Sequence, residues 1–280
     1  MKTKALSSTG LGGSRRNPRF HLSFPSAVPA LKANGYALLP GLTHWFDKLN
    51  PLHHPEAWTA LRDGKVASFI HAHSEQQAQY CLNDFGEIEI DRKSSVGFAE
   101  KRGKTHLTVG ESATRIACDP RLPSATQLYL NNCIEFLNGV RNYLHEILPP
   151  PSLKTSLTMR VFHYSAATES TGGKQAAESM RPHVDGSICT LIIAQSDGLL
   201  EFESDGQWQS AIENDGHPFS LLIPGIAAAH DLCVEPTPHQ VLRGPQSRIS
   251  ITAFLKPKLG SDRRRAQRTL ARWRLDKRYH

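Results

Sequence analysis

Several features that define whole classes of proteins are missing from this sequence of 280 residues. No run of apolar residues approaches the roughly 18 that a membrane-spanning helix needs. The basic start of the chain lacks the apolar segment of a secretory signal, so we expect no export. Apolar residues make up 39% and charged residues 21%. This mixture excludes collagen, a coiled coil and a chain disordered throughout, and it suits one large globular domain or two small ones.

Cysteine is sparse, and no two of the five cysteines form a CxxC pair. An odd and scattered set argues against a disulfide framework and against a zinc ribbon. It is typical of buried thiols in a reducing compartment, so we expect a cytoplasmic protein. The five residues are Cys81, Cys118, Cys133, Cys189 and Cys233.

Acidic residues are scarce at the two ends of the chain. Residues 1–19 carry a net charge of +5 and residues 258–280 carry +7, whereas residues 20–257 carry −5. Basic ends occur in proteins that bind nucleic acid, but solvated tails and a helix with a basic outer face explain the same charge. We therefore expect neither a nucleic-acid partner nor a membrane, and the oligomeric state stays open.

Changes of periodicity divide the chain into four segments. Residues 1–18 form a basic Gly/Ser/Arg-rich tail that we expect to be mobile. Residues 19–155 are predicted to be a helical N-terminal region whose loops shape a pocket. Residues 156–257 are predicted to form a β-rich core. Residues 258–280 form a basic C-terminal extension that we expect to be helical.

Apolar residues recur at helical spacing from Pro123 to Leu148, which predicts one long helix ended by three consecutive prolines. Residues 43–63 also appear helical, with breaks at Pro51 and Pro55, whereas 64–122 mix polar runs with short β-like pieces. Beyond the long helix, short apolar runs alternate with turn signals and no helix intervenes, which predicts an antiparallel barrel or jelly roll with flanking helices. The predicted strands are Ser156–Tyr164, Ile188–Ala194, Leu199–Glu203, Trp208–Ile212, Phe219–Pro224, Gln240–Leu242 and Ile249–Leu255.

Three His-x-Asp/Glu tripeptides occur, when chance alone predicts roughly one, so none is informative by itself. One of them, His73-Ser-Glu75, lies in the mixed segment 64–122. His54-Pro-Glu56 lies in the proline-broken helical region, and we interpret it as surface or packing. His183-Val-Asp185 lies at the mouth of a strand, where a spacing of two places both side chains on one face. His239, four predicted strands later, is the best candidate for a third ligand. Two imidazoles and one carboxylate on one face suit Fe(II) and leave positions open for substrates.

A second pair with the same spacing follows nine residues later. Arg248 and Ser250 share one face of the next predicted strand. A guanidinium and a hydroxyl together bind a carboxylate well, because the arginine offers a planar fork of donors and the serine adds one more. This pair is therefore placed to hold the far carboxylate of a metal-bound dicarboxylic acid. Alone, each of these residues also has an ordinary structural role, such as a strand-end histidine or a surface ion pair.

In this ordered pattern, H-x-D then H then R-x-S, the sequence resembles the Fe(II)/2-oxoglutarate-dependent oxygenases of the isopenicillin N synthase-like family. The resemblance runs from about Gly35 to Pro257 and is strongest from Leu157 onward. The segment Arg160–Tyr164 resembles the family strand that ends in a tyrosine touching the cosubstrate. Phe162 departs from the family pattern, since many members have asparagine there.

The resemblance implies a double-stranded β-helix of the cupin type, with Fe(II) held by His183, Asp185 and His239. It implies that Arg248, Ser250 and Tyr164 bind the cosubstrate 2-oxoglutarate. The implied activity is an O₂-dependent oxidation of a small molecule (hydroxylation, desaturation or ring formation) with release of succinate and CO₂, in the setting of specialised metabolism.

Three alternatives stay open at the level of sequence. The same scaffold supports an iron oxidase that does not use 2-oxoglutarate. The basic termini also suit a protein that binds or modifies nucleic acid. A metal-free β-barrel binding module is the third.

Overall fold

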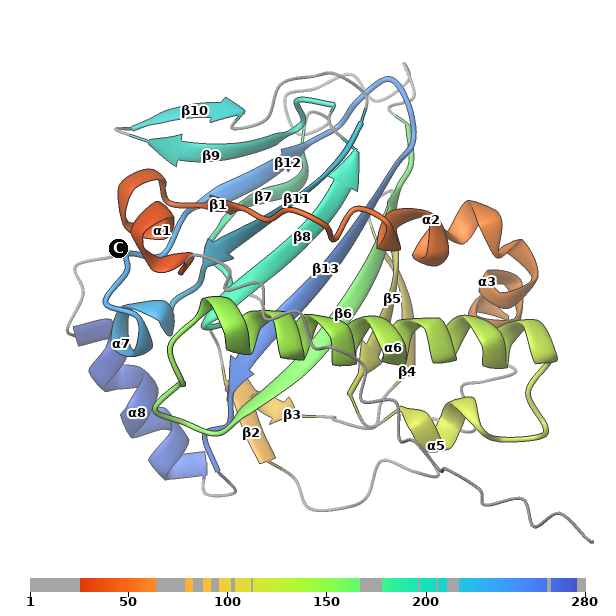
Figure 1. The fold of residues 1–280 in the computed structure, drawn as a ribbon, viewed down its shortest axis with the longest axis horizontal. Helices are drawn as coiled ribbons and strands as arrows, with labels where there is room; N and C mark the ends of the chain where they lie inside the picture. The colour runs from red at the N-terminus through yellow and green to blue at the C-terminus, as the bar shows by residue number, and fades with distance from the viewer. Residues whose placement is uncertain are drawn as a thin grey trace, which may run out of the picture.

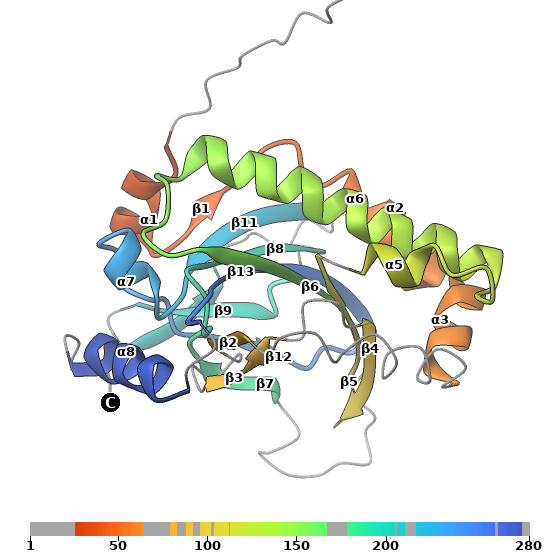
Figure 2. The same ribbon diagram turned by 90° about the horizontal axis from the view of Figure 1, so that it is seen from below.

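In the computed structural model, the alternating apolar pattern of the second half of the chain forms two antiparallel sheets that face each other (Figures 1 and 2). The large sheet has the strand order β1-β11-β8-β13-β6-β5-β4, and the small sheet has the order β10-β9-β12-β7. A further pair, β2-β3, forms a separate two-stranded sheet. The structure describes residues 26–63, 79–82, 88–91, 96–101, 104–111, 113–166, 178–195, 197–204, 206–210, 217–260 and 263–275.

Helices and strands follow one another along the chain as the periodicity predicts for the second half. The helices are α1 (Val28–Asn34), α2 (Trp45–Leu49), the 3₁₀ turn η1 (Pro51–His53), α3 (Pro55–Arg62), α5 (Thr114–Ala117), α6 (Ser124–Ile147), α7 (Ala228–Asp231) and α8 (Arg263–Leu275). The strands are β1 (Ala37–Leu38), β2 (Gln79–Leu82), β3 (Ile88–Asp91), β4 (Val96–Lys101), β5 (Lys104–Gly110), β6 (Thr155–Tyr164), β7 (Glu178–His183), β8 (Cys189–Gln195), β9 (Leu200–Ser204), β10 (Gln207–Ser210), β11 (Pro218–Pro224), β12 (His239–Leu242) and β13 (Arg248–Pro257).

The long helix α6 covers the outer face of the large sheet, and Figure 2 shows it lying across the strands with α1, α2 and α3 on the same side. Its buried positions recur every three to four residues and include Tyr129, Phe136 and Leu137, which are almost fully buried. Arg141 of α6 pairs with Glu111, and the same carboxylate accepts a hydrogen bond of 2.9 Å from the backbone N–H of Leu157. The helix is therefore joined to the sheet by packing and by one ion pair.

Two hydrophobic clusters fill the molecule, one on each side of the large sheet. Strand β8 is buried along six successive residues, since Leu191 and Ile193 face the helices while Ile192 and Ala194 face the small sheet. This explains its unbroken apolar run, which is typical of a strand covered on both faces. The predicted mainly β fold with a jelly-roll core and flanking helices is confirmed.

The first half of the chain is richer in strands than the sequence indicated. Strands β4 and β5 fall in the segment 64–122, and they extend the large sheet beyond β6. The register places β5 alongside β6 from Lys104 opposite Tyr164 to Gly110 opposite Thr158. The predicted tail of residues 1–18 lies outside the described residues. Among the residues that the structure describes, no helix combines the length and the apolar character needed to cross a membrane.

Candidate metal centre

The two histidines and the aspartate of the predicted ligand set meet between the two sheets. His183 is the last residue of β7 and His239 is the first residue of β12, and the two residues are paired in the register of the small sheet. Their ring centroids are 4.2 Å apart. Asp185 lies in the turn after β7 and is not itself part of the strand, so the turn, rather than the strand alternation assumed from the sequence, aims its carboxylate at the histidines.

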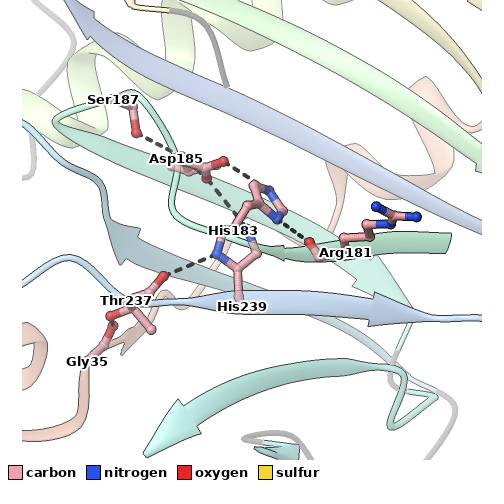
Figure 3. A network of polar contacts seen from close by, with 8 residues as sticks. Gly35, Arg181, His183, Asp185, Ser187, Thr237 and His239 are labelled. Carbon is pink, nitrogen blue, oxygen red and sulfur yellow. Dashed lines mark hydrogen bonds and ion pairs between the residues drawn. The ribbon is translucent and has the colours of Figure 1, made fainter. Parts of the chain in front are cut away.

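The three potential ligand atoms lie within 4.8 Å of one another. Nε2 of His183 is 3.5 Å from Oδ1 of Asp185, and Nε2 of His239 is 3.8 Å from Oδ2. Figure 3 shows the three side chains pointing toward one another. Within the described part of the chain this is the single group of three or more such residues.

Both imidazoles are held so that the nitrogen facing the carboxylate is a lone-pair donor. Nδ1 of His183 donates to the carbonyl of Arg181 at 2.8 Å, and Nδ1 of His239 donates to the carbonyl of Thr237 at 3.2 Å. A neutral imidazole with its proton on Nδ1 has its lone pair on Nε2. Three electron-pair donors therefore converge in a buried space, and a cation is the group that satisfies all three.

The turn that carries Asp185 is fixed by contacts that the sequence analysis did not anticipate. Thr190 of β8 donates a hydrogen bond of 2.6 Å to Oδ2 of Asp185, and the hydroxyl of Ser187 lies 3.0 Å from that of Thr190. The backbone carbonyl of Asp185 accepts from the N–H of Ile226 at 2.9 Å. Gly225 lies so close that a Cβ there would be 2.7 Å from the same carbonyl oxygen. No sequence motif marks these residues, because the turn after β7 and the end of β11 meet only in the folded chain.

Electrostatics keep the metal-binding carboxylate charged. Burial acts to raise the pKa of Asp185, but His239, His183 and the Thr190 hydroxyl outweigh it and lower the pKa to about 2. Burial lowers the pKa of His239, against the attraction of Asp185, so its neutral form is favoured. A charged carboxylate and a neutral imidazole are the forms that bind a metal.

Tyr164, Arg248 and Ser250 line the same cavity as the three potential ligands. In the register of β6 and β13, Arg248 is opposite Tyr164, and the guanidinium carbon is 5.4 Å from the tyrosine ring. Arg248 is 4% exposed, and its Nη1 is buried without a hydrogen-bond partner among the described residues. Burial raises the pKa of Tyr164 to about 12, against the opposing effect of Arg248, so its phenol is an O–H donor. A buried guanidinium with one N–H group left without an acceptor fits an anionic ligand of the cavity.

Asp197 is a further residue at this site that the sequence did not reveal. Its Oδ2 lies 2.9 Å from Nε of Arg248, while its Oδ1 accepts the backbone N–H of Leu199 at 3.1 Å. The turn between β8 and β9 thus fixes the carboxylate beside the arginine. An Asp-Gly turn is a common signal, so only the strand register could have indicated this contact.

The remaining cavity wall is mainly apolar, and it includes Phe162 and Phe254. Phe162 occupies the position where the family pattern often has asparagine, and it adds a ring to the wall in place of a polar group.

His54 belongs to another of the His-x-Asp/Glu tripeptides considered above. It packs on Tyr129 at a centroid distance of 4.9 Å, and its Nε2 donates to the carbonyl of Lys48. Neither contact involves a residue that lines the cavity. Its predicted role in packing therefore agrees with the structure.

Comparisons with known proteins identify the fold. No protein-family model matches the sequence, and a search of curated proteins finds no match. Solved structures do match. A full-length Neurospora crassa protein, solved in complex with alpha-KG and 5-formyluracil, has a TM-score of 0.57 at 15% identity, over 83% of this chain and 77% of that one. A putative oxygenase of Shewanella oneidensis has a TM-score of 0.56 at 17% identity, over 89% and 93% of the two chains.

A dioxygenase for auxin oxidation from rice has a TM-score of 0.50 at 15% identity, over 81% of this chain and 75% of that one. At these identities the likeness concerns the fold. This chain therefore has the jelly-roll fold of the Fe(II)/2-oxoglutarate-dependent oxygenases, with a His-Asp-His group at its centre.

Proposed function

We propose that this protein is an Fe(II)- and 2-oxoglutarate-dependent oxygenase that oxidises a small organic molecule. The observation that carries the proposal is the convergence of two imidazole lone pairs and one carboxylate in the same cavity as a buried arginine. The first group supplies a facial set of ligands for Fe(II). The second supplies the counter-charge for a dicarboxylate cosubstrate.

The residues divide this work between the two ends of the cavity. His183, Asp185 and His239 would hold Fe(II). Arg248, Ser250 and Tyr164 would bind the distal carboxylate of 2-oxoglutarate through one cation and two hydroxyl groups. When bound, iron and 2-oxoglutarate supply the oxidising chemistry, in which O₂ is consumed and succinate and CO₂ are released. The protein contributes the orientation of these groups and an apolar wall that keeps bulk water away from them.

Three matched structures support the proposal by their names and ligands. The Neurospora crassa protein was solved with alpha-KG and 5-formyluracil, and two others are named as an oxygenase and a dioxygenase. By analogy with the first, the substrate of this protein is a small molecule. The choice among hydroxylation, desaturation and ring formation, a role in specialised metabolism and a cytoplasmic location all stay predictions from the sequence.

Anaerobic addition of Fe(II) and then 2-oxoglutarate tests the proposal. We expect a visible metal-to-ligand charge-transfer band that requires both additions and is absent from the Asp185→Ala variant. We also expect succinate to form when O₂ is admitted. A folded wild-type protein that shows no band under these conditions would contradict the proposal.

The same experiment separates the alternatives. An oxidase that does not use 2-oxoglutarate would bind iron and consume O₂ without forming succinate. A metal-free β-barrel module would give equal iron contents in the wild-type protein and the Asp185→Ala variant, measured after desalting. We expect instead that the variant loses most of its iron, because two histidines alone leave the charge of the cation uncompensated.

A further inference from the structure

A second arginine lies on the sheet face that borders the cavity, on the strand next to the one that carries Arg248. Along β6, Phe162 and Tyr164 line the cavity, and the alternation of a strand puts Arg160 on the same face. The register places Arg160 opposite Thr252, which also lines the cavity. The guanidinium carbon of Arg160 lies 5.4 Å from the ring centroid of Phe254.

Arg160 and Arg248 lie at different positions along the large sheet. Arg248 is opposite Tyr164 in the register of β6 and β13, and Arg160 precedes Tyr164 by four residues on β6, which is about 13 Å of strand length. Thr190, which donates to Asp185, is opposite Phe254, the residue that Arg160 contacts. The two arginines are thus placed to bind different anions.

Further cations and one polar ring surround the same aromatic wall. Nζ of Lys256 lies 5.8 Å from the centroid of Phe254, and Nζ of Lys104 lies 5.5 Å from that of Phe162. The ring of His106 is 5.4 Å from Phe162, and its Nδ1 is buried without a hydrogen-bond partner in the described part of the chain. Three cationic groups stacked on two phenyl rings create a positive potential along this wall.

Two contacts position the guanidinium of Arg160. Its Nε donates to the hydroxyl of Thr108 on β5 at 3.3 Å, and its central carbon lies 5.4 Å from the ring centroid of Phe254. A fixed, planar fork of donors in a partly buried site is the arrangement that recognises a carboxylate with two parallel hydrogen bonds. The neighbouring ring offers an apolar surface to the rest of such a molecule.

We propose that the organic substrate is a carboxylic acid with an aromatic or other apolar body, and that Arg160 binds its carboxylate while Phe254 packs against the body. This inference rests on the proposed function, since it assigns the substrate of the same site. Arg160 is the specificity residue that binds the substrate carboxylate. Lys104 and Lys256 reinforce the positive potential around this carboxylate without being its main ligands.

The test uses a panel of aromatic and aliphatic carboxylic acids of six to twelve carbons, each paired with its uncharged primary amide. Two quantities are measured for each compound: its binding to the anaerobic Fe(II)- and 2-oxoglutarate-loaded protein by calorimetry, and its stimulation of succinate release in air. We expect acids to bind and to stimulate, and their matched amides to do so at least about 10-fold more weakly. Arg160→Met keeps an apolar stem beside Phe254 and removes the charge. It should lower the affinity for the best acid about 30-fold.

Arg160→Lys keeps the charge but not the planar fork, so it should recover part of the lost affinity. The exposed residue Arg62 supplies a matched control, since Arg62→Met removes a guanidinium at the surface. It should change neither measurement. The charge-transfer band should still form in Arg160→Met, because the cosubstrate arginine is Arg248. A structural role for Arg160 alone would alter acids and amides equally.

Three results would overturn the inference: no acid of the panel binds, amides bind as well as acids, or Arg160→Met binds the acids with unchanged affinity. Each of these can be observed while the charge-transfer band of the wild-type protein is present, in which case the proposed function stands and only the substrate assignment fails. Loss of the band from the wild-type protein would instead contradict the proposed function. Calorimetry without turnover would still decide whether Arg160 recognises acids.

Discussion

Arg248 is a buried cation whose Nη1 has no acceptor among the described residues, which is an unfavourable state for the folded protein by itself. Asp197 contacts Nε of the same guanidinium, so Nη1 is the donor left for a ligand. We predict that Arg248→Met lowers the affinity for 2-oxoglutarate by about 2–3 kcal/mol, roughly 30- to 150-fold, because a charge-assisted contact is lost. Titration of the charge-transfer band with 2-oxoglutarate measures this effect.

The melting temperature of the ligand-free variant reports on a second contact of Arg248. Arg248→Met leaves Asp197 without the guanidinium that lies 2.9 Å from its Oδ2, so the melting temperature should fall. Arg62→Met is the matched control for both measurements. A variant that melts much earlier but still binds 2-oxoglutarate normally would show that Arg248 has a structural role instead.

The pH dependence of the metal-free protein follows from His239. Its folded-state pKa lies below the ordinary 6.5 because of burial. Between the folded and unfolded values the unfolded chain binds more protons, so the free energy of unfolding rises with pH up to about 6.5 and falls as the solution is acidified below it. We predict a lower urea midpoint at pH 5.5 than at pH 7 in the presence of a chelator.

His239→Gln should reduce this pH dependence, since glutamine has no proton to gain. Asp185 contributes in a separate and more acidic window. Its pKa is lowered from 3.8 to about 2, so the stability that it provides is present above about 4 and is lost as the pH falls through about 2. An unchanged slope between pH 7 and 5.5 in His239→Gln would assign the effect to other groups.

At the scale of the element, the end of β11 supports the turn after β7. A Cβ on Gly225 would lie 2.4 Å from the carbonyl oxygen of Ser187 and 2.7 Å from that of Asp185. Both obstacles are backbone atoms, so the turn must shift. We predict that Gly225→Ala lowers iron affinity at least about 10-fold, because a displacement of even about 1 Å at a ligand is costly. Iron content after desalting measures the effect.

Gly97 provides the control for this substitution. It lies in strand β4, and a Cβ there meets no atom within 4 Å. Gly97→Ala should leave the iron content unchanged, and it should not reduce stability, because alanine loses less conformational entropy than glycine on folding. Equal losses of iron in the two variants would show that the effect is not specific to the turn.

Helix α6 offers a second matched pair on one element. Phe136 is fully buried against the sheet, whereas Leu128, two turns earlier, is 59% exposed. We predict that Phe136→Ala lowers the free energy of unfolding by about 3–5 kcal/mol, through lost burial and a cavity, and that Leu128→Ala changes it by less than about 0.5 kcal/mol. Urea denaturation of both variants measures the difference. Similar values would mean that α6 is not a main part of the core.

At the scale of the whole molecule, the chain from Pro123 onward could be predicted well from its sequence, and the segment 64–122 could not. Strand β6 was expected over Ser156–Tyr164 and is observed over Thr155–Tyr164, because local alternation and flanking turns define it. Strands β4 and β5 have a mixed polar pattern, so their own alternation does not identify them as strands. They form because β5 pairs with β6 and β4 pairs with β5.

The candidate site shows the same division. His183, Asp185 and His239 carry a spacing that can be recognised in a sequence, and so do Arg248 and Ser250. Thr190, Gly225 and Asp197 carry none, since each reaches the site through strand register or through the meeting of two turns. The residues that fix the orientation of a ligand are therefore harder to predict than the ligands themselves.

The distribution of charge leads to a prediction about nucleic acid. The body of the chain is acidic, with −5 over residues 20–257, and only the ends are basic. We predict that a 20-base-pair DNA duplex binds no more tightly than the non-specific range, a Kd weaker than about 1 μM, at 150 mM salt. Fluorescence anisotropy at 50 and 200 mM salt measures the affinity and its slope. Tight binding that persists at the higher salt would favour the nucleic-acid alternative.

The segment between the first helix and the first strand reaches the metal group through the backbone of Gly35. The carbonyl of Gly35, just after α1, accepts a hydrogen bond of 2.6 Å from the hydroxyl of Thr237, whose own carbonyl orients His239 (Figure 3). A shortened version made for expression or crystallisation should therefore begin before Ser26. Trimming past Gly35 would remove the buried residues Ala27 and Leu31 and loosen His239, and the resulting weak activity would be misread as a property of the enzyme.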